Sequence, residues 1–112
     1  MKIYHNPRCS KSRQTLEILK EQGKEPEVVL YLDTPPTEHE LKEVLEMLEM
    51  DAFDLIRRNE SIFKDQFKGQ QHSNEEWIRI MVANPKLIER PIVVHEKRAT
   101  IGRPPENVLS IL

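Results

Sequence analysis

The first third of the chain places two extended apolar runs on either side of a helical stripe. Residues 2–5 predict a short strand, which ends at Asn6-Pro7 because proline lacks a backbone donor and holds the preceding residue extended. Residues 10–22 predict a helix that Gly23 ends, and its apolar face comprises Thr15, Leu16 and Leu19. The unbroken apolar run within 27–32 predicts a buried strand, parallel to the first because a helical crossover joins them.

The middle of the chain, residues 36–89, predicts a helical block that follows the boundary at Pro35-Pro36. Between its longer helices, residues 51–59 predict a further short helix. Two capping boxes open the longer helices, Thr37 with Glu40 and Ser73 with Glu76. Apolar residues recur at helical spacing behind each box, and we expect them to lie in the core: Leu41, Val44, Leu45 and Leu48 in the first helix, and Trp77, Ile80 and Met81 in the second.

The last quarter of the chain returns to extended patterns. Residues 91–95 and 98–102 predict two strands joined by Glu96-Lys97 as a hairpin, although this turn pair lacks the favoured glycine or asparagine. Pro104-Pro105 then begins a final helix, because proline is well tolerated in a first helical turn. The apolar side of that helix carries Val108, Leu109 and Leu112.

The order of these elements is strand, helix, strand, helical block, two strands and helix. This order predicts an α/β chain with a thioredoxin-like fold, in which the helical insertion 36–89 separates a βαβ unit from a C-terminal ββα unit. A chain of 112 residues has the usual size of one domain. We therefore expect residues 1–112 to form a single domain.

Charge and composition exclude several classes of function. The formal net charge of -2 and the pI near 6.1 predict no general attraction to nucleic acid or to anionic lipid. The apolar runs are too short to span a membrane, and residues 1–4 lead into a strand instead of a signal peptide, so we expect a cytoplasmic protein. One cysteine and four scattered histidines predict neither an intramolecular disulfide nor a metal site. Nothing in the pattern demands a dimer, so we expect a monomer.

The single cysteine, Cys9, falls between the first predicted strand and the first predicted helix. A sulfur at a helix N-terminus lies near unpaired N–H groups and a partial positive charge, which favour the thiolate. Arg8, Lys11 and Arg13 surround the same turn, and His5 lies four residues earlier. Such groups lower the pKa of a thiol further. The alternative is that Cys9 only fills the core as a small apolar residue.

Two familiar cysteine chemistries do not fit this turn. A cysteine phosphatase loop needs an arginine six positions after the cysteine to hold the anion, and that position is Thr15. A dithiol oxidoreductase needs Cys-x-x-Cys, and the second position is Ser12. The second thiol of any redox cycle must therefore come from another molecule.

The segment from His5 to Leu16, HNPRCSKSRQTL, resembles the signature HNPxCxxSRxTL of the glutaredoxin-coupled arsenate reductase (ArsC) family. Further matches run along the chain: Leu30-Tyr31-Leu32 with Pro35-Pro36, Ile56-Arg57-Arg58-Asn59, Arg90-Pro91-Ile92-Val93-Val94, and Gly102-Arg103-Pro104. Within the family, the chain is most similar to the YfgD-like branch. The resemblance implies an arsenate reductase fold, in which Cys9 is the nucleophile that attacks arsenate.

The same resemblance implies that Arg57, Arg90 and Arg103 hold the oxyanion. Guanidinium groups suit this role because they stay charged and direct two donors onto a tetrahedral anion. Arg58 could replace Arg57 if the register is shifted, since adjacent helical residues point about 100 degrees apart. The family resemblance also implies a cis peptide before Pro91. The alternative for each arginine is a solvated surface charge.

The resemblance further implies that His5 helps to hold the Cys9 thiolate, and that Ser12 and Arg13 shape the anion loop. The alternative for His5 is a strand-end histidine with a satisfied backbone contact.

Three functions remain to be weighed. The resemblance implies an enzyme that reduces arsenate with glutathione and glutaredoxin as electron sources and holds no bound cofactor. A regulator resembling Spx, which binds RNA polymerase, shares the fold but generally carries Cys-x-x-Cys and lacks the arsenate-holding arginines. A monothiol oxidoreductase acting on another substrate would need only one activated sulfur. Because Ser12 replaces the second cysteine and the three arginines are present, the sequence favours the arsenate reductase.

Overall fold

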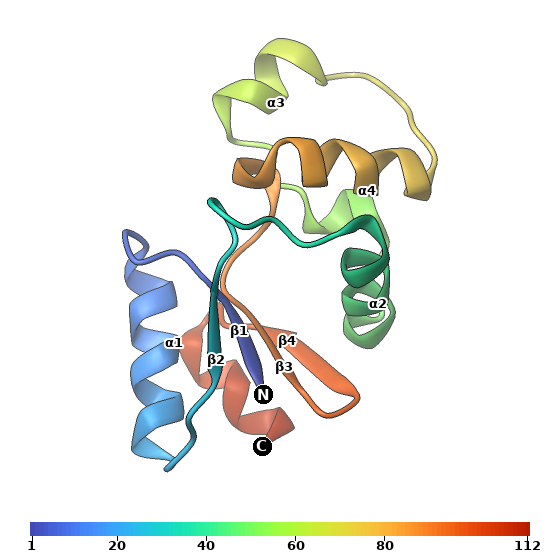
Figure 1. Cartoon of the computed structure of the whole chain (residues 1–112). Helices are drawn as coiled ribbons and strands as arrows, with labels where there is room; N and C mark the ends of the chain where they lie inside the picture. Colours follow the sequence, from blue (N-terminus) through green and yellow to red (C-terminus); the bar gives the residue numbers. More distant parts are fainter. The chain divides into compact units, whose positions relative to one another are not determined.

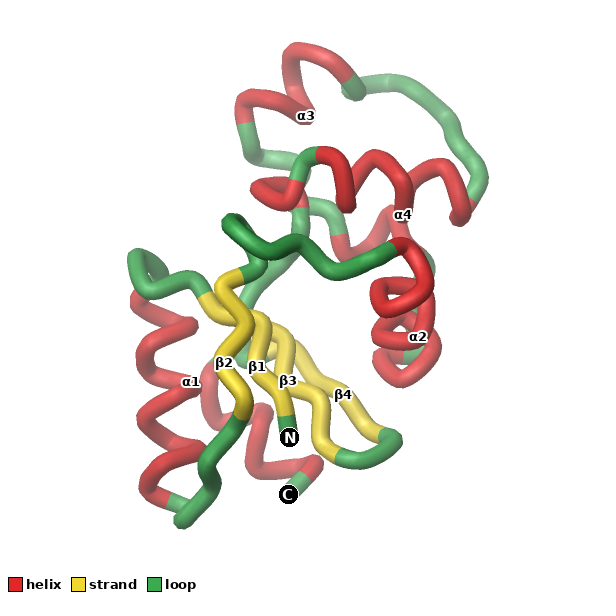
Figure 2. Tube along the Cα trace, viewed as in Figure 1, coloured by secondary structure: helices red, strands yellow, loops and turns green.

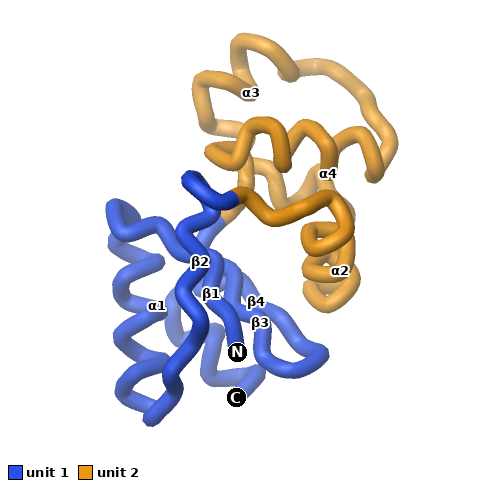
Figure 3. Tube along the Cα trace, in the orientation of Figure 1, with its two compact units in different colours: residues 1–34, 90–112 blue, residues 35–89 orange.

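The computed structural model of the protein describes all 112 residues, which form two units (Figure 3). The first unit combines residues 1–34 with residues 90–112. The second unit is residues 35–89. None of the helices has the length and hydropathy that a membrane span requires.

A four-stranded sheet forms the centre of the first unit (Figure 2). Its strands are β1 (Lys2–His5), β2 (Glu27–Leu30), β3 (Ile92–His95) and β4 (Arg98–Ile101), in the order β2-β1-β3-β4. The first two are parallel, whereas β3 is antiparallel to both β1 and β4. This mixed sheet with its helices confirms the predicted α/β, thioredoxin-like fold.

The helix α1 (Ser10–Glu21) and the 3-10 helix η3 (Pro105–Ile111) pack against each other and cover one face of the sheet (Figure 1). Gly23 follows α1 with a φ of 75°, the left-handed conformation in which glycine ends helices. The core between these elements is apolar and almost fully buried: Ile3, Leu19, Val93, Val108 and Ile111. Apolar residues of β1, α1, β3 and η3 thus form one core between the sheet and its two helices.

The prediction that 27–32 forms a buried strand is wrong in part. The strand ends at Leu30, because the carbonyl of Leu30 accepts hydrogen bonds from Asp33 and Thr34 and closes a turn. It also lies at the edge of the sheet, where Val28 and Leu30 keep 44% and 41% of their surface exposed. The parallel pairing with β1 is confirmed.

The predicted C-terminal helix is present, but its apolar side is wrong at Leu109, whereas Val108 lies in the core and Leu112 packs against it. Pro105, Val108 and Ile111 are buried, whereas Leu109 is 47% exposed. The segment is a 3-10 helix with three residues per turn, so positions i, i+3 and i+6 share a face. In an α-helix, by contrast, positions i, i+1 and i+4 share a face, which is the spacing of Val108, Leu109 and Leu112.

The second unit contains α2 (Glu38–Leu48), η1 (Ala52–Leu55), α3 (Ser61–Gln66), α4 (Asn74–Ala83) and η2 (Pro85–Leu87). Both predicted capping boxes are present, at Thr37 with Glu40 and at Ser73 with Glu76. Trp77 packs among the rings of Phe53, Phe63, Phe67 and His72.

The short helix expected over 51–59 is confined to the 3-10 turn η1. Ile56 then forms an isolated antiparallel bridge with Ile88, and the Arg57 N–H donates to the carbonyl of Leu87 at 2.8 Å. Arg57 and Arg58 therefore follow an extended segment, and the helical angle assumed between them does not apply. The helix α3 was not predicted at all.

Candidate active site

The turn between β1 and α1 presents Cys9 as the N-cap of α1, as the sequence predicted. The backbone of Cys9 is extended, with φ -95° and ψ 122°, and its N–H donates to the carbonyl of Asn6 at 3.0 Å. Its carbonyl accepts the first helical hydrogen bond from Arg13. Cys9 is 9% exposed, so the sulfur is largely shielded while it remains at the surface of the unit.

Opposing effects act on the pKa of the Cys9 thiol. Burial raises it, but the Ser12 N–H, the Arg90 charge, the Lys11 N–H and the Arg103 side chain all lower it. The effects that lower the pKa together outweigh burial, and the pKa of Cys9 lies below its ordinary value. Two of these donors are free N–H groups of the first helical turn, so the helix N-terminus acts on the sulfur as expected.

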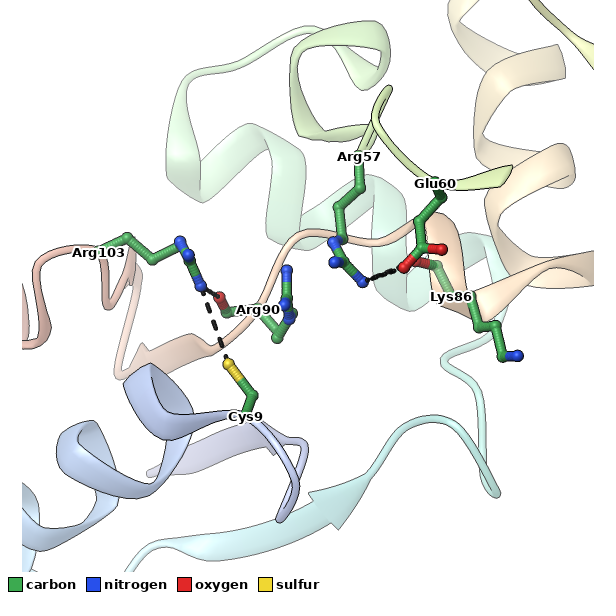
Figure 4. A network of polar contacts seen from close by, with 6 residues as sticks. All are labelled: Cys9, Arg57, Glu60, Lys86, Arg90 and Arg103. Atoms are coloured by element: carbon green, nitrogen blue, oxygen red, sulfur yellow. Dashed lines mark hydrogen bonds and ion pairs between the residues drawn. The ribbon is translucent and has the colours of Figure 1, made fainter. Parts of the chain in front are cut away.

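Two arginines from the far end of the sequence approach this turn (Figure 4). The Arg103 guanidinium donates to the Cys9 sulfur at 3.9 Å and to the carbonyl of Arg90 at 3.3 Å. Arg90 is half-buried, whereas Arg103 is exposed. Both peptide bonds that follow these arginines, Arg90-Pro91 and Arg103-Pro104, are cis. The structure therefore brings together Cys9, Arg90 and Arg103, which the sequence separates widely.

Close packing at the end of β4 positions the backbone that leads into Arg103. A Cβ atom at Gly102 would overlap the Thr15 hydroxyl and lie 2.9 Å from the Pro91 ring. Only glycine fits between these groups without displacing them. Gly102 was expected only as part of the family resemblance. Its position directly before Arg103 is the sequence signal that indicates its role.

His5 and Ser12 form a buried polar pair behind the cysteine turn. The His5 Nδ1 lies 2.6 Å from the Ser12 hydroxyl, which also accepts the Asn6 N–H at 3.0 Å. Burial and the charges of Lys20 and Arg13 lower the pKa of His5, so its neutral form is favoured. His5 therefore contacts the turn through Ser12 and not through the cysteine sulfur.

The cations near Cys9 in sequence have different surroundings. The Arg13 guanidinium donates to the carbonyl of Pro7 at 2.9 Å and holds the turn from its exposed side. Lys11 acts on the sulfur through its backbone N–H and is otherwise exposed. The Arg8 side chain is exposed. The side-chain charge that lowers the pKa of Cys9 belongs to Arg90, which lies far from Cys9 in the sequence.

Arg57 belongs to the second unit, where it pairs with Glu60. Its guanidinium lies 2.7 Å from the Glu60 carboxylate and 3.4 Å from the Lys86 carbonyl (Figure 4). Arg58 instead lies over the ring of Phe53, 4.6 Å from its centroid. Glu60 was not predicted as a partner of Arg57, although its position three residues later suits an ion pair.

The arrangement in the first unit combines a nucleophile with anion-binding groups. A thiol with a lowered pKa supplies thiolate near neutral pH. Guanidinium groups beside it can hold a tetrahedral oxyanion and stabilise negative charge on it. No group of three or more His, Cys, Asp or Glu side chains is placed to hold a metal ion. The lowered pKa of Cys9 and the Arg103 guanidinium 3.9 Å from its sulfur suit attack by sulfur on an anion.

Known proteins are similar to this chain in sequence and in fold. The chain is 54% identical to the uncharacterized protein YfgD of Escherichia coli (strain K12), over 100% of this chain and 96% of that protein. It is 41% identical to an arsenate reductase of Neisseria meningitidis, over 100% and 97% of the two chains. The solved structure of the arsenate reductase from Vibrio cholerae superposes with a TM-score of 0.95 at 46% identity, covering 99% of this chain and 96% of that one.

The model of the ArsC family matches residues 4–111, which include the cysteine turn, Arg57, Arg90 and Arg103. This match covers nearly the whole chain and agrees with relatives well above 30% identity. The protein belongs to the ArsC family.

Proposed function

We propose that the protein is an arsenate reductase that uses the Cys9 thiolate as its nucleophile. The observation that carries the proposal is the sulfur of Cys9 at a helix N-terminus with the Arg103 guanidinium 3.9 Å away. Relatives that are arsenate reductases, at about 40% identity over the full chain, support the same reaction.

The first step joins the Cys9 sulfur to arsenic. The thiolate attacks arsenate, an S–As bond forms, and one arsenate oxygen leaves as water after protonation. Arg90 and Arg103 hold the remaining oxygens and stabilise their charge. A low pKa of Cys9 assists because the thiolate, not the thiol, is the nucleophile.

The second step requires a thiol from outside the chain, because Cys9 is the single cysteine. Glutathione attacks the adduct, an S–S bond forms, and the electron pair of the S–As bond stays on arsenic as arsenite. Arsenate and two thiols thus give arsenite, water and a mixed disulfide. A glutaredoxin thiol then takes the glutathionyl group and returns Cys9 to its reduced form. We place this cycle in the cytoplasm, where thiols are kept reduced.

His5, Ser12 and Arg13 act on the turn instead of on the substrate. Ser12 joins His5 to the Asn6 N–H, and Arg13 holds the Pro7 carbonyl, so these residues position the cysteine. The family resemblance gives Arg57 a place on the oxyanion, and we keep that assignment as part of the proposal. Replacing Arg57 with alanine should lower kcat/KM for arsenate, whereas Arg58→Ala serves as the matched control.

A reduction assay with arsenate, glutathione and glutaredoxin tests the proposal directly. We expect arsenite to form with the wild-type protein and not with Cys9→Ser. Folded wild-type protein without turnover would reject arsenate reduction. Transfer of glutathione from a glutathionylated protein under the same conditions would then favour the monothiol oxidoreductase, which needs only the activated sulfur.

A further inference from the structure

A cleft of ≈ 270 Å³ lies on the first unit, between the cysteine turn and the end of β2. One wall is formed by residues 5–8, which lead directly to Cys9, and the other by Leu30, Leu32 and Asp33. The walls are adjacent because His5 and Leu30 are partners in the parallel pairing of β1 and β2. The proposed steps with arsenate assign no role to this cleft.

The lining has an apolar part that is open to solvent. Leu30 and Leu32 are 41% and 37% exposed, although the chain buries most of its large apolar side chains. Covering apolar surface of this kind with a ligand removes it from water, which makes the free energy of binding more favourable.

One unpaired charge of each sign accompanies this apolar surface. The Arg8 N–H donates to the Asn6 side chain, but the Arg8 guanidinium has no ion-pair partner. The Asp33 N–H donates to the Leu30 carbonyl, and the Asp33 carboxylate likewise has no ion-pair partner. The cleft therefore offers one cation, one anion and an apolar floor, which suits a small ligand that carries both charges.

We propose that this cleft binds the peptide part of the glutathione that reacts at Cys9. Arg8 pairs with a carboxylate of the tripeptide, Asp33 pairs with its ammonium group, and Leu30 and Leu32 contact its backbone. The cleft volume lies near the lower limit of ligand sites, roughly 300 Å³, which favours a tripeptide over a large cofactor. The inference rests on the proposed function, since that function requires an external thiol beside Cys9.

The binding test uses S-methylglutathione, which keeps the charges of glutathione but has no reactive thiol. In the Cys9→Ser background, its addition should shift the amide NMR signals of residues 5–8 and 30–33. Arg8→Ala and Asp33→Asn should each raise its Kd by about three- to tenfold, because each removes a charge-assisted contact. Arg98→Ala and Glu21→Ala are the matched controls, since both side chains are exposed and outside the cleft.

A kinetic test separates this inference from the proposed function. In the arsenate assay, Arg8→Ala should raise the KM for glutathione while the KM for arsenate stays unchanged. Binding of S-methylglutathione in the cleft without any arsenate turnover would reject the reductase and retain the cleft. Turnover with an unchanged Kd and KM in both Arg8→Ala and Asp33→Asn would retain the reductase and overturn the cleft. A change confined to the KM for glutaredoxin would also overturn it, because the surface would then serve the protein partner.

Discussion

At the scale of single residues, the charge of the Cys9 sulfur depends on groups from three parts of the first unit. Burial opposes ionisation, whereas two backbone N–H groups of α1 and the side chains of Arg90 and Arg103 favour it. The same arginines that stabilise the thiolate are those proposed to hold arsenate. In the proposed mechanism, substrate binding and nucleophile activation therefore use the same guanidinium groups.

The first prediction is that the thiol of Cys9 titrates below the value of about 8.5 of a free cysteine. Thiolate absorbance followed against pH measures the midpoint, with Cys9→Ser as the blank. Arg90→Ala should raise the midpoint because it removes a positive charge. Since the folded-state pKa is the lower one, the ionised thiol stabilises the fold above about pH 8.5, and this contribution is lost as pH falls through the folded-state pKa. A midpoint at or above the free value would contradict the described surroundings.

The second prediction concerns the two arginines beside the sulfur. Arg90→Ala and Arg103→Ala should each lower kcat/KM for arsenate by about 10- to 1,000-fold, because each removes a donor to the developing charge. Lysine should restore only part of the activity, since it keeps the charge but loses the planar pair of donors.

Arg98→Ala is the control for both arginine variants, because Arg98 is an exposed arginine of β4 away from the cysteine turn. Full activity in both alanine variants would remove these arginines from the site.

At the scale of elements, the cysteine turn is held between β1, α1 and the end of β4. Ser12 connects the first two through His5 and Asn6, and Gly102 packs against Thr15 of α1. Small changes at these junctions should therefore act on the site through the positions of whole elements.

The third prediction is that Ser12→Ala destabilises the fold by about 1–3 kcal/mol. The substitution leaves the Asn6 N–H and the His5 Nδ1 without their shared hydroxyl, and unpaired buried polar groups carry a cost of this size. Urea denaturation measures the free energy of unfolding. Ser10→Ala provides the control because Ser10 is exposed in the same helical turn. Equal unfolding free energies in the two variants would show that the buried pair contributes nothing.

The fourth prediction is that Gly102→Ala separates β4 from α1. The added methyl group would overlap the Thr15 hydroxyl and the Pro91 ring, and such overpacking costs about 1–3 kcal/mol. Because Arg103 follows directly, its guanidinium should move away from the sulfur, so the pKa of Cys9 should also rise. The double variant Gly102→Ala with Thr15→Ala, which removes both the clashing hydroxyl and the neighbouring methyl group of Thr15, should recover part of the stability. An unchanged melting temperature and thiol titration would oppose this account.

At the scale of the whole molecule, the number of sulfur atoms limits the redox cycle. The chain carries one cysteine, so it forms no internal disulfide. Enzymes that use thioredoxin usually form an internal disulfide first, which this chain lacks the thiols to do.

The fifth prediction is that arsenate turnover requires glutathione together with glutaredoxin. Mass spectrometry should detect a glutathione adduct on the wild-type protein after arsenate treatment and none on Cys9→Ser. Thioredoxin with its reductase should not replace the pair. Full turnover with thioredoxin in the absence of glutathione would disprove this mechanism even for a true arsenate reductase.

Local patterns in the sequence were sufficient wherever the cause of a structure lies within a few residues. The two capping boxes, the helix start at Cys9 and the helix end at Gly23 were all predicted, because each depends on backbone hydrogen bonds between near neighbours. The order of elements likewise predicted the α/β fold, since a helical crossover and a tight hairpin restrict how short strands can pair.

Only the tertiary structure decided features that depend on partners distant in sequence. The exposure of Leu30 follows from the edge position of β2 in the sheet. The buried face of residues 105–111 follows from the 3-10 geometry of this segment, which packs against α1. The approach of Arg90 and Arg103 to Cys9 also needed the fold, because it spans more than 80 positions of the chain (90 - 9 = 81). A hydrophobic pattern records the period of a segment but not its neighbours. The sequence therefore determined the order of the strands and longer helices and the place of Cys9 at a helix start, whereas packing decided which surfaces and charges meet.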